Sequence, residues 1–267
     1  MRAMEQDLAL LCPGCGYDVR GTASEACAEC GAELDRAALA WTQIPWVQPE
    51  RGALSGFVAT AWWVTQYPKR AAQEVGRPIE FAPAQRFRQI MVLWLTLPAV
   101  GAVLLAWWAG AWESWPGWLA GVTAVGIVLG TWLAMQAITG VPTYFLHPRH
   151  LSVERQNRAV ALGHYACGPM VFLPVLLGLL TGISPFVEFS EIAGPIAIIV
   201  LAGLTLVSIL GFWRVCRVLM SRTANRSASA VALIASLLPI IWGVLLLAGI
   251  LGVPLLAGYV ALIVQSF

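Results

Sequence analysis

The stretch CPGCGYDVRGTASEACAEC, residues 12–30, contains two Cys-x-x-Cys pairs, formed by Cys12 with Cys15 and by Cys27 with Cys30. A glycine follows each pair, which lets the main chain turn tightly beside the sulfur atoms. Four cysteine thiolates form a closed structural zinc site, whereas a catalytic zinc keeps one position open for water. The spacing therefore predicts a small zinc ribbon with short β knuckles over residues 1–34, holding structural Zn²⁺ without chemistry at the metal.

A redox dithiol and a pair of disulfides are the alternatives for these cysteines. Residues 1–40 show no apolar run behind a basic start, so we expect the ribbon to stay in the cytosol, where thiols remain reduced. Redox Cys-x-x-Cys motifs also occur singly, at the start of a helix. With only Tyr17, Val19 and Leu34 as core candidates, metal binding would supply most of the folding free energy, about 10 kcal/mol.

The same stretch resembles the zinc ribbon that opens many bacterial membrane proteins of unassigned function. The matching residues are Cys12, Cys15, Gly16, Tyr17, Asp18, Arg20, Gly21, Cys27, Cys30 and Gly31. The resemblance implies a pair of zinc knuckles on short strands and names no ligand. Between the knuckles, Tyr17, Asp18 and Arg20 are candidate contacts for a protein partner. Their alternative role is to hold the ribbon loop together.

Residues 35–88 form a predicted cytosolic linker that contains one amphipathic helix at 51–67. The apolar residues of this helix recur at helical spacing, and they are Leu54, Phe57, Val58, Ala61 and Trp62. Several Gly, Ser, Thr and Gln residues make the segment too polar for a preferred transmembrane span, and its tryptophans suit the headgroup level. We therefore expect this helix to lie in the membrane interface.

The rest of the chain has the composition of a membrane protein. Of the 267 residues, 59% are hydrophobic and 11% are charged, against about 45–50% and about 25% in soluble domains. The predicted fold class is an all-α polytopic membrane helical bundle over residues 89–267. Its five apolar segments are each near the roughly 20 residues that a span needs, and they cover about 90–110, 118–139, 164–183, 193–213 and 230–251. An apolar C-terminal tail follows, with a sixth span as the alternative.

The charges of the connecting loops predict the orientation of this bundle. With the N-terminus in the cytosol, the two inner loops at 140–163 and 214–229 carry seven arginines, and the outer loops at 111–117 and 184–192 carry none. This distribution follows the positive-inside rule. We therefore expect a protein of the cytoplasmic (inner) membrane with a cytosolic ribbon.

Glycines spaced four apart predict close helix packing in the second span. The pairs are Gly117 with Gly121 and Gly126 with Gly130. Packing within one bundle is the favoured explanation, and contact between copies in a homo-oligomer is the alternative.

No sequence feature predicts an enzyme. The middles of the five predicted spans hold no Asp, Glu, Lys, Arg or His, and no known catalytic motif is present. The net charge of +2 leaves no basic field for nucleic acid. A transporter for a small molecule or lipid is the alternative function, with a water-accessible cavity lined by Gln136 and the threonines.

Residues 51–267 resemble the Yip family of membrane proteins, chiefly at Tyr67-Pro68-Lys69-Arg70 and Gln85-Arg86-Phe87-Arg88. The resemblance implies five packed spans, a cytosolic N-terminus and a non-enzymatic scaffold. The D-L-Y-G-P signature of that family is absent, so binding of small GTPases is not carried over. We expect a scaffold or adaptor in the lipid bilayer that presents its ribbon to a cytosolic or membrane protein.

Overall fold

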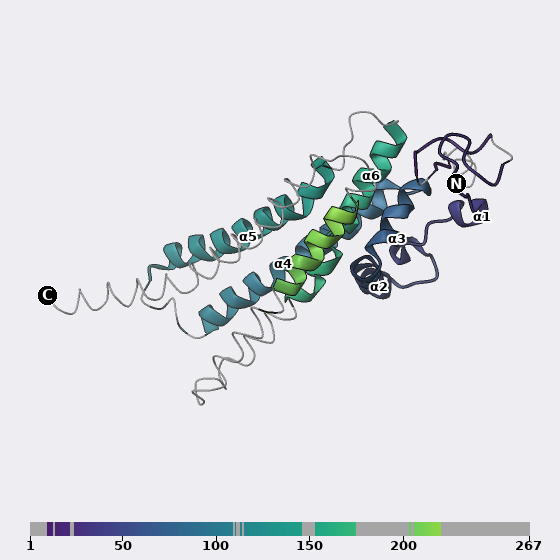
Figure 1. Cartoon of the computed structure of the whole chain (residues 1–267). Helices are drawn as coiled ribbons and strands as arrows, with labels where there is room; N and C mark the ends of the chain where they lie inside the picture. Colours follow the sequence, from purple (N-terminus) through teal and green to yellow (C-terminus); the bar gives the residue numbers. More distant parts are fainter. Residues whose placement is uncertain are drawn as a thin grey trace.

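The computed structural model describes residues 10–12, 14–21, 24–108, 110, 113, 115–145, 153–174, 203 and 206–219. Within these residues the chain is mostly helical and contains no strand (Figure 1). The elements in chain order are α1 (Arg36–Leu39), η2 (Pro45–Val47), α2 (Ala53–Gln66), α3 (Pro68–Gln73), η3 (Glu74–Gly76), α4 (Phe81–Trp108), α5 (Gly117–Phe145), α6 (Val153–Tyr165) and η4 (Gly168–Val171).

Helices α4 and α5 form the long axis of the molecule (Figure 1). The described residues contain two helices long and apolar enough to cross a membrane, Phe81–Trp108 and Gly117–Gly140. They cover most of the first predicted span, about 90–110, and all of the second, about 118–139. Large apolar side chains such as Leu93, Leu104 and Trp108 are exposed along α4, as expected for a helix that contacts lipid. This is weak evidence for a membrane location, and the orientation and the kind of membrane remain predictions.

The described residues of the predicted inner loop at 140–163 are helical. Helix α5 continues to Phe145, and α6 occupies Val153–Tyr165. The predicted third span would begin at His164, but α6 ends one residue later and a 3₁₀ turn follows at Gly168–Val171. Pro169 lies in the first turn of this 3₁₀ helix, where its missing N–H group is tolerated. The sequence analysis missed α6 because its polar residues resemble those of a loop.

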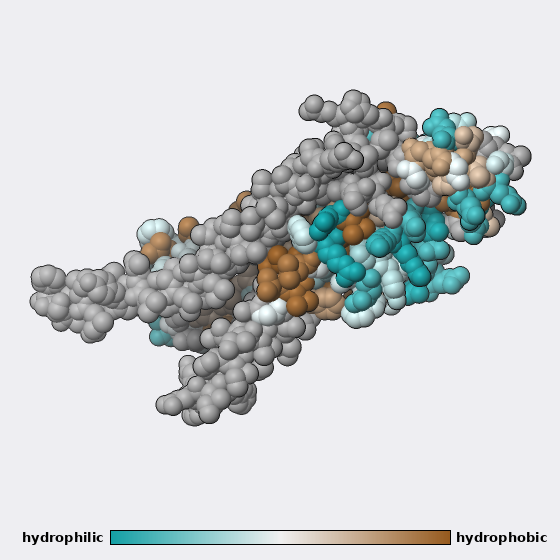
Figure 2. Space-filling view, viewed as in Figure 1, coloured by the Kyte–Doolittle hydropathy of each residue, from teal (hydrophilic) through white to brown (hydrophobic). Residues whose placement is uncertain are grey.

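Residues 206–219 are also helical, so the helix extends past the predicted end of the fourth span at 213. Val215, Cys216 and Leu219 are buried in the main core, which explains why the chain stays helical there. Figure 2 shows this helix, bright green in Figure 1, as apolar toward one end and hydrophilic toward the other. The predicted span at 230–251, the C-terminal tail and most of 175–205 lie outside the described residues.

Residues 35–88, called the connector below, contribute many side chains to the main core of the protein. The Trp46 ring packs edge-on against Phe57 and Phe87, with ring centroids 6.4 and 6.0 Å apart. The ring of Phe87 also packs against the ring of Tyr165 in α6, with ring centroids 5.1 Å apart. These aromatic contacts join the connector to α4 and α6 in one core. Figure 2 shows hydrophilic residues gathered at this end of the molecule, beside the ribbon.

The apolar face predicted for helix α2 is split between the protein core and the outside. Its buried residues are Gly56, Phe57, Thr60, Ala61 and Val64. Leu54, Val58 and Trp62 instead form an exposed stripe at four-residue spacing. The helix lies across α4 rather than along it (Figure 1). The predicted apolar face is therefore divided, because two of its residues face the protein core and three face outward.

The glycine pairs of α5 do not mark a contact within the described part of the chain. A Cβ atom added at Gly117, Gly121, Gly126 or Gly130 would meet nothing within 4 Å. Gly140 is different, since a Cβ there would lie 2.7 Å from a terminal guanidinium nitrogen of Arg88. The end of the Arg88 side chain of α4 therefore lies directly against Gly140 of α5.

Candidate metal centre

The two halves of the ribbon form the same main-chain turn. The amide of Gly16 donates to the Cys12 carbonyl at 2.8 Å, and that of Gly31 donates to the Cys27 carbonyl at 2.9 Å. Both glycines have positive φ angles, 81° and 70°, which side chains with a Cβ rarely adopt. Each turn thereby folds its two cysteine side chains toward one point.

Each knuckle is flanked by a single antiparallel bridge. Leu11 pairs with Asp18 around the first knuckle, and Ala26 pairs with Glu33 around the second. The sequence analysis expected short β knuckles on strands, but the described part of the ribbon has isolated bridges only. So short a ladder stabilises the ribbon little, which leaves its fold dependent on the cysteines.

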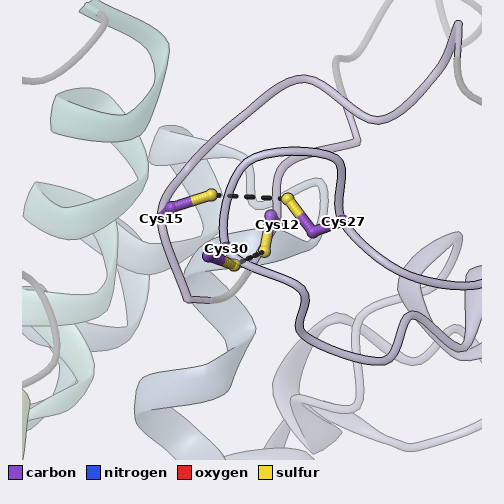
Figure 3. Close-up of side chains that lie close together, drawn as sticks. All are labelled: Cys12, Cys15, Cys27 and Cys30. Atoms are coloured by element: carbon purple, nitrogen blue, oxygen red, sulfur yellow. Dashed lines mark hydrogen bonds between the residues drawn. The ribbon is translucent and has the colours of Figure 1, made fainter.

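The four cysteine sulfurs converge between the two turns (Figure 3). The sulfurs of Cys12 and Cys30 are 3.6 Å apart, those of Cys15 and Cys27 are 3.5 Å apart, and all four lie within 4.8 Å of one another. A tetrahedral zinc with Zn–S bonds of about 2.3 Å requires sulfurs about 3.8 Å apart. All four thiols are free, and the cluster could bind a metal ion, consistent with the predicted zinc ribbon.

The surroundings of the sulfurs separate their pKa values. The main-chain N–H groups of Cys30 and Glu29 lower the pKa of Cys27 to about 7, since they stabilise its thiolate. Burial raises the pKa of Cys15 to about 12 and also raises that of Cys12. Cys27 is thus the first of these three to offer a thiolate at neutral pH, and metal binding must displace protons from the other two.

The candidate contact residues lie between the turns. Tyr17 is 37% exposed, whereas the predicted core residues Val19 and Leu34 are buried. Asp18 and Arg20 are exposed and form an ion pair with each other, with a shortest N–O distance of 2.7 Å. Hydrogen bonds from Arg20 lower the pKa of Asp18. This geometry fits the loop-holding role and leaves the predicted partner contact as a proposal.

The ribbon is attached to the helices through the main-chain oxygen of Gly76. The Leu11 amide of the ribbon donates to this oxygen at 3.1 Å, and Arg158 Nη1 of α6 donates to it at 3.2 Å. Arg158 is 2% exposed and also forms an ion pair with Glu154. Burial lowers the pKa of Arg158, while the carboxylates of Glu154 and Asp18 oppose this shift. One carbonyl therefore joins the ribbon, η3 and α6.

Glu74, two residues before Gly76, holds another part of the connector against η3. Its carboxylate accepts hydrogen bonds from the Thr42 hydroxyl at 2.9 Å and from the main-chain N–H of Gln43 at 3.0 Å, and it forms an ion pair with Arg77. The side chain is 1% exposed, and burial raises its pKa. η3 is thus a junction at which Glu74 and Gly76 hold three segments of the chain.

The sequence analysis counted Arg158 among the arginines of an inner loop and assigned no role to Glu74. Glu154 and Arg158 have the i, i+4 spacing of a helical ion pair, a signal that could have predicted α6. No local pattern indicates that Glu74 is buried, because its partners at Thr42 and Gln43 are about thirty residues away in the chain.

Comparison with protein-family models, with curated proteins and with solved structures gave no match. The resemblance of residues 51–267 to the Yip family therefore remains a prediction from the sequence.

Proposed function

We propose that this protein is an integral membrane scaffold whose N-terminal zinc ribbon forms part of a rigid cytosolic face for a protein partner. Zinc is the metal that best suits four converging thiolates. Because four protein ligands close a tetrahedral site, the metal would stabilise the fold and would not take part in catalysis.

The observation that supports this proposal is the junction at η3. A ribbon on a flexible tether would have its own mobile surface, but here the Leu11 amide is bonded to Gly76, which Arg158 also contacts. The ribbon is thus hydrogen-bonded to η3, which packs in the main core with α4, α5 and α6. The exposed side chains of Tyr17, Asp18 and Arg20 would form part of the surface that such a scaffold presents.

Site-specific photocrosslinking in cells tests the proposal. A photoreactive amino acid replaces Tyr17 in the ribbon, and in a second form it replaces Trp41, which is also exposed but lies outside the ribbon. We expect one defined protein to be captured from position 17 and not from position 41. The double variant Cys27→Ser, Cys30→Ser, compared at equal membrane abundance, should lose this capture.

The same captured set from both positions, or a set unaffected by loss of the cysteines, would contradict the scaffold proposal. Purified full-length protein must also contain about one zinc per chain, which the double cysteine variant lacks. Extraction of the membranes with alkaline carbonate tests membrane integration independently of any partner.

The alternative transporter function gains no support from the described polar residues. Gln136 Nε2 donates to Gln89 Oε1 at 2.8 Å between α5 and α4. The hydroxyls of Thr96 and Thr131 donate to carbonyls of their own helices, at Val92 and Ile127. These groups already have hydrogen-bond partners, so they do not need a water-filled cavity.

A further inference from the structure

The exposed stripe of α2 borders an apolar groove against α4. Leu54 and Phe57 of α2 form one wall, and Ile90, Leu93, Trp94 and Leu97 of α4 form the other. The groove has a volume of about 340 Å³, and its lining residues are all apolar. The one N–H group among these side chains, on Trp94, already donates to the Val171 carbonyl at 2.8 Å. The groove therefore suits a hydrocarbon ligand.

The helical spacing of α4 places the side chain of Arg86, a cation, next to one end of this groove. Arg86 is exposed and precedes Ile90 by four residues on α4. The positions 86, 90, 93 and 97 lie on one face of an α-helix. Arg86 thus lies about one helical turn, roughly 6 Å along the helix, before the start of the apolar wall. Along this face of α4 a positive charge is followed by apolar side chains. A phospholipid has the same order, with a phosphate followed by acyl chains.

The position of the groove along α4 fits the same ligand. It lies where α2 crosses the N-terminal half of α4 (Figure 1), near the end of the molecule at which Figure 2 shows hydrophilic residues. Leu54 and Leu93 are 77% and 60% exposed, so both walls face outward. If α4 spans the membrane with its N-terminus in the cytosol, the groove opens toward the cytoplasmic leaflet.

We propose that the groove between α2 and α4 is a binding site for one anionic glycerophospholipid, with an acyl chain along Ile90, Leu93 and Leu97 and the phosphate beside Arg86. The site would fix α2 in the membrane interface and connect the cytosolic face to the bilayer. This inference rests on the proposed membrane location.

Native mass spectrometry of the full-length protein tests the site. Protein reconstituted with phosphatidylglycerol and phosphatidylcholine is extracted with mild detergent, and the lipid that remains bound is identified. We expect one phosphatidylglycerol per chain. Leu93→Trp, which fills the groove, should reduce retention at least fivefold. Leu104→Trp is the matched control, because Leu104 is also exposed on α4 but lies outside the groove, and it should leave retention unchanged.

The headgroup preference is tested with a charge variant. Arg86→Gln should reduce the preference for phosphatidylglycerol over phosphatidylcholine at least threefold. Lys69→Gln removes an exposed charge from α3 and should not change it. Equal retention by wild type and Leu93→Trp would overturn the site, as would a crosslink from position 93 to a second copy or to another segment of the chain. If carbonate removes the protein from membranes, the proposed membrane function fails; if the protein stays in the membrane without bound lipid, only the lipid site fails.

Discussion

Leu11 in the ribbon and Arg158 in α6 share one hydrogen-bond acceptor, the main-chain oxygen of Gly76, at 3.1 and 3.2 Å. They are separated by 147 residues in the chain (158 − 11) but meet at a single carbonyl. The ribbon keeps its own small apolar cluster, separate from the core that contains α6, so this carbonyl is a polar link between the two.

Arg158→Met should loosen the junction without removing metal from the ribbon. A hydrogen bond from a buried charged group contributes about 1.5–3 kcal/mol, and methionine retains most of the side-chain volume. Because the Arg158 bond is lost, we expect faster amide hydrogen exchange in 74–80 and 153–165. Because the Leu11 bond to Gly76 remains, we expect the zinc content of the ribbon to be unchanged. Asn157→Ala, at an exposed position of the same helix, is the control. Unchanged exchange in the Arg158 variant would contradict a coupling role.

The cysteine site was largely predictable from the sequence because its information is local. Two Cys-x-x-Cys turns and two glycines determine where the sulfurs lie, and the φ angles of Gly16 and Gly31 match that interpretation. The long apolar helices were predictable for a similar reason, since span length and hydropathy are properties of one segment.

The junction was not predictable in this way. The burial of Glu74 and Arg158 depends on contacts between distant segments, and their sequence neighbourhoods resemble exposed helix surfaces. The same limit applies to α2, where periodicity identified a helix but could not distinguish the face that packs on Phe87 from the face that remains open. Packing against a second element decides these features.

Glu74 and Arg77 should show strong energetic coupling. Glu74→Gln would leave the mostly buried guanidinium of Arg77 without its counter-charge, and Arg77→Gln would leave a buried carboxylate unpaired. Breaking one side of a buried pair costs about 3–5 kcal/mol. We expect the double variant to lose less stability than the sum of the single variants, with a coupling of about 1–3 kcal/mol.

Thermal unfolding in detergent measures the stability of the protein, of the variants Glu74→Gln and Arg77→Gln, and of the double variant. Glu80→Gln serves as the control, because Glu80 is exposed and its replacement should change stability by less than about 0.5 kcal/mol. Additive single effects would show that the ion pair does not stabilise the junction.

Gly31→Ala should weaken metal binding through main-chain strain alone. Gly31 has a φ of 70°, and an added Cβ would meet nothing within 4 Å, so no steric clash contributes. The left-handed conformation costs a residue with a Cβ about 1–2 kcal/mol, which corresponds to roughly a 5- to 30-fold loss of zinc affinity. Competition with a chelator measures the zinc affinity of each variant. Gly21→Ala also has open space and no positive φ, and it should retain wild-type affinity; equal losses in both variants would contradict the explanation.

Zinc binding by the ribbon should weaken steeply as the pH falls. The pKa of Cys27 is about 7, whereas burial raises the pKa values of Cys12 and Cys15. Near pH 8 the metal must therefore displace at least two protons, from Cys12 and Cys15, and below pH 7 it must displace a third from Cys27. Since protons compete with zinc for the same thiolates, the apparent affinity should change by at least about 100-fold per pH unit above pH 7 and at least about 1000-fold below it.

Chelator competition at pH 8, 7 and 6 gives this slope, and an indicator dye in weakly buffered solution counts the released protons directly. Cys167→Ala is the matched control, because Cys167 is a buried cysteine of the main core rather than of the ribbon, and it should leave both readings unchanged. A dependence shallower than tenfold per pH unit would mean that the thiols are already deprotonated before the metal arrives. The main-chain N–H groups, rather than zinc, would then provide most of the stabilisation of the sulfur charges.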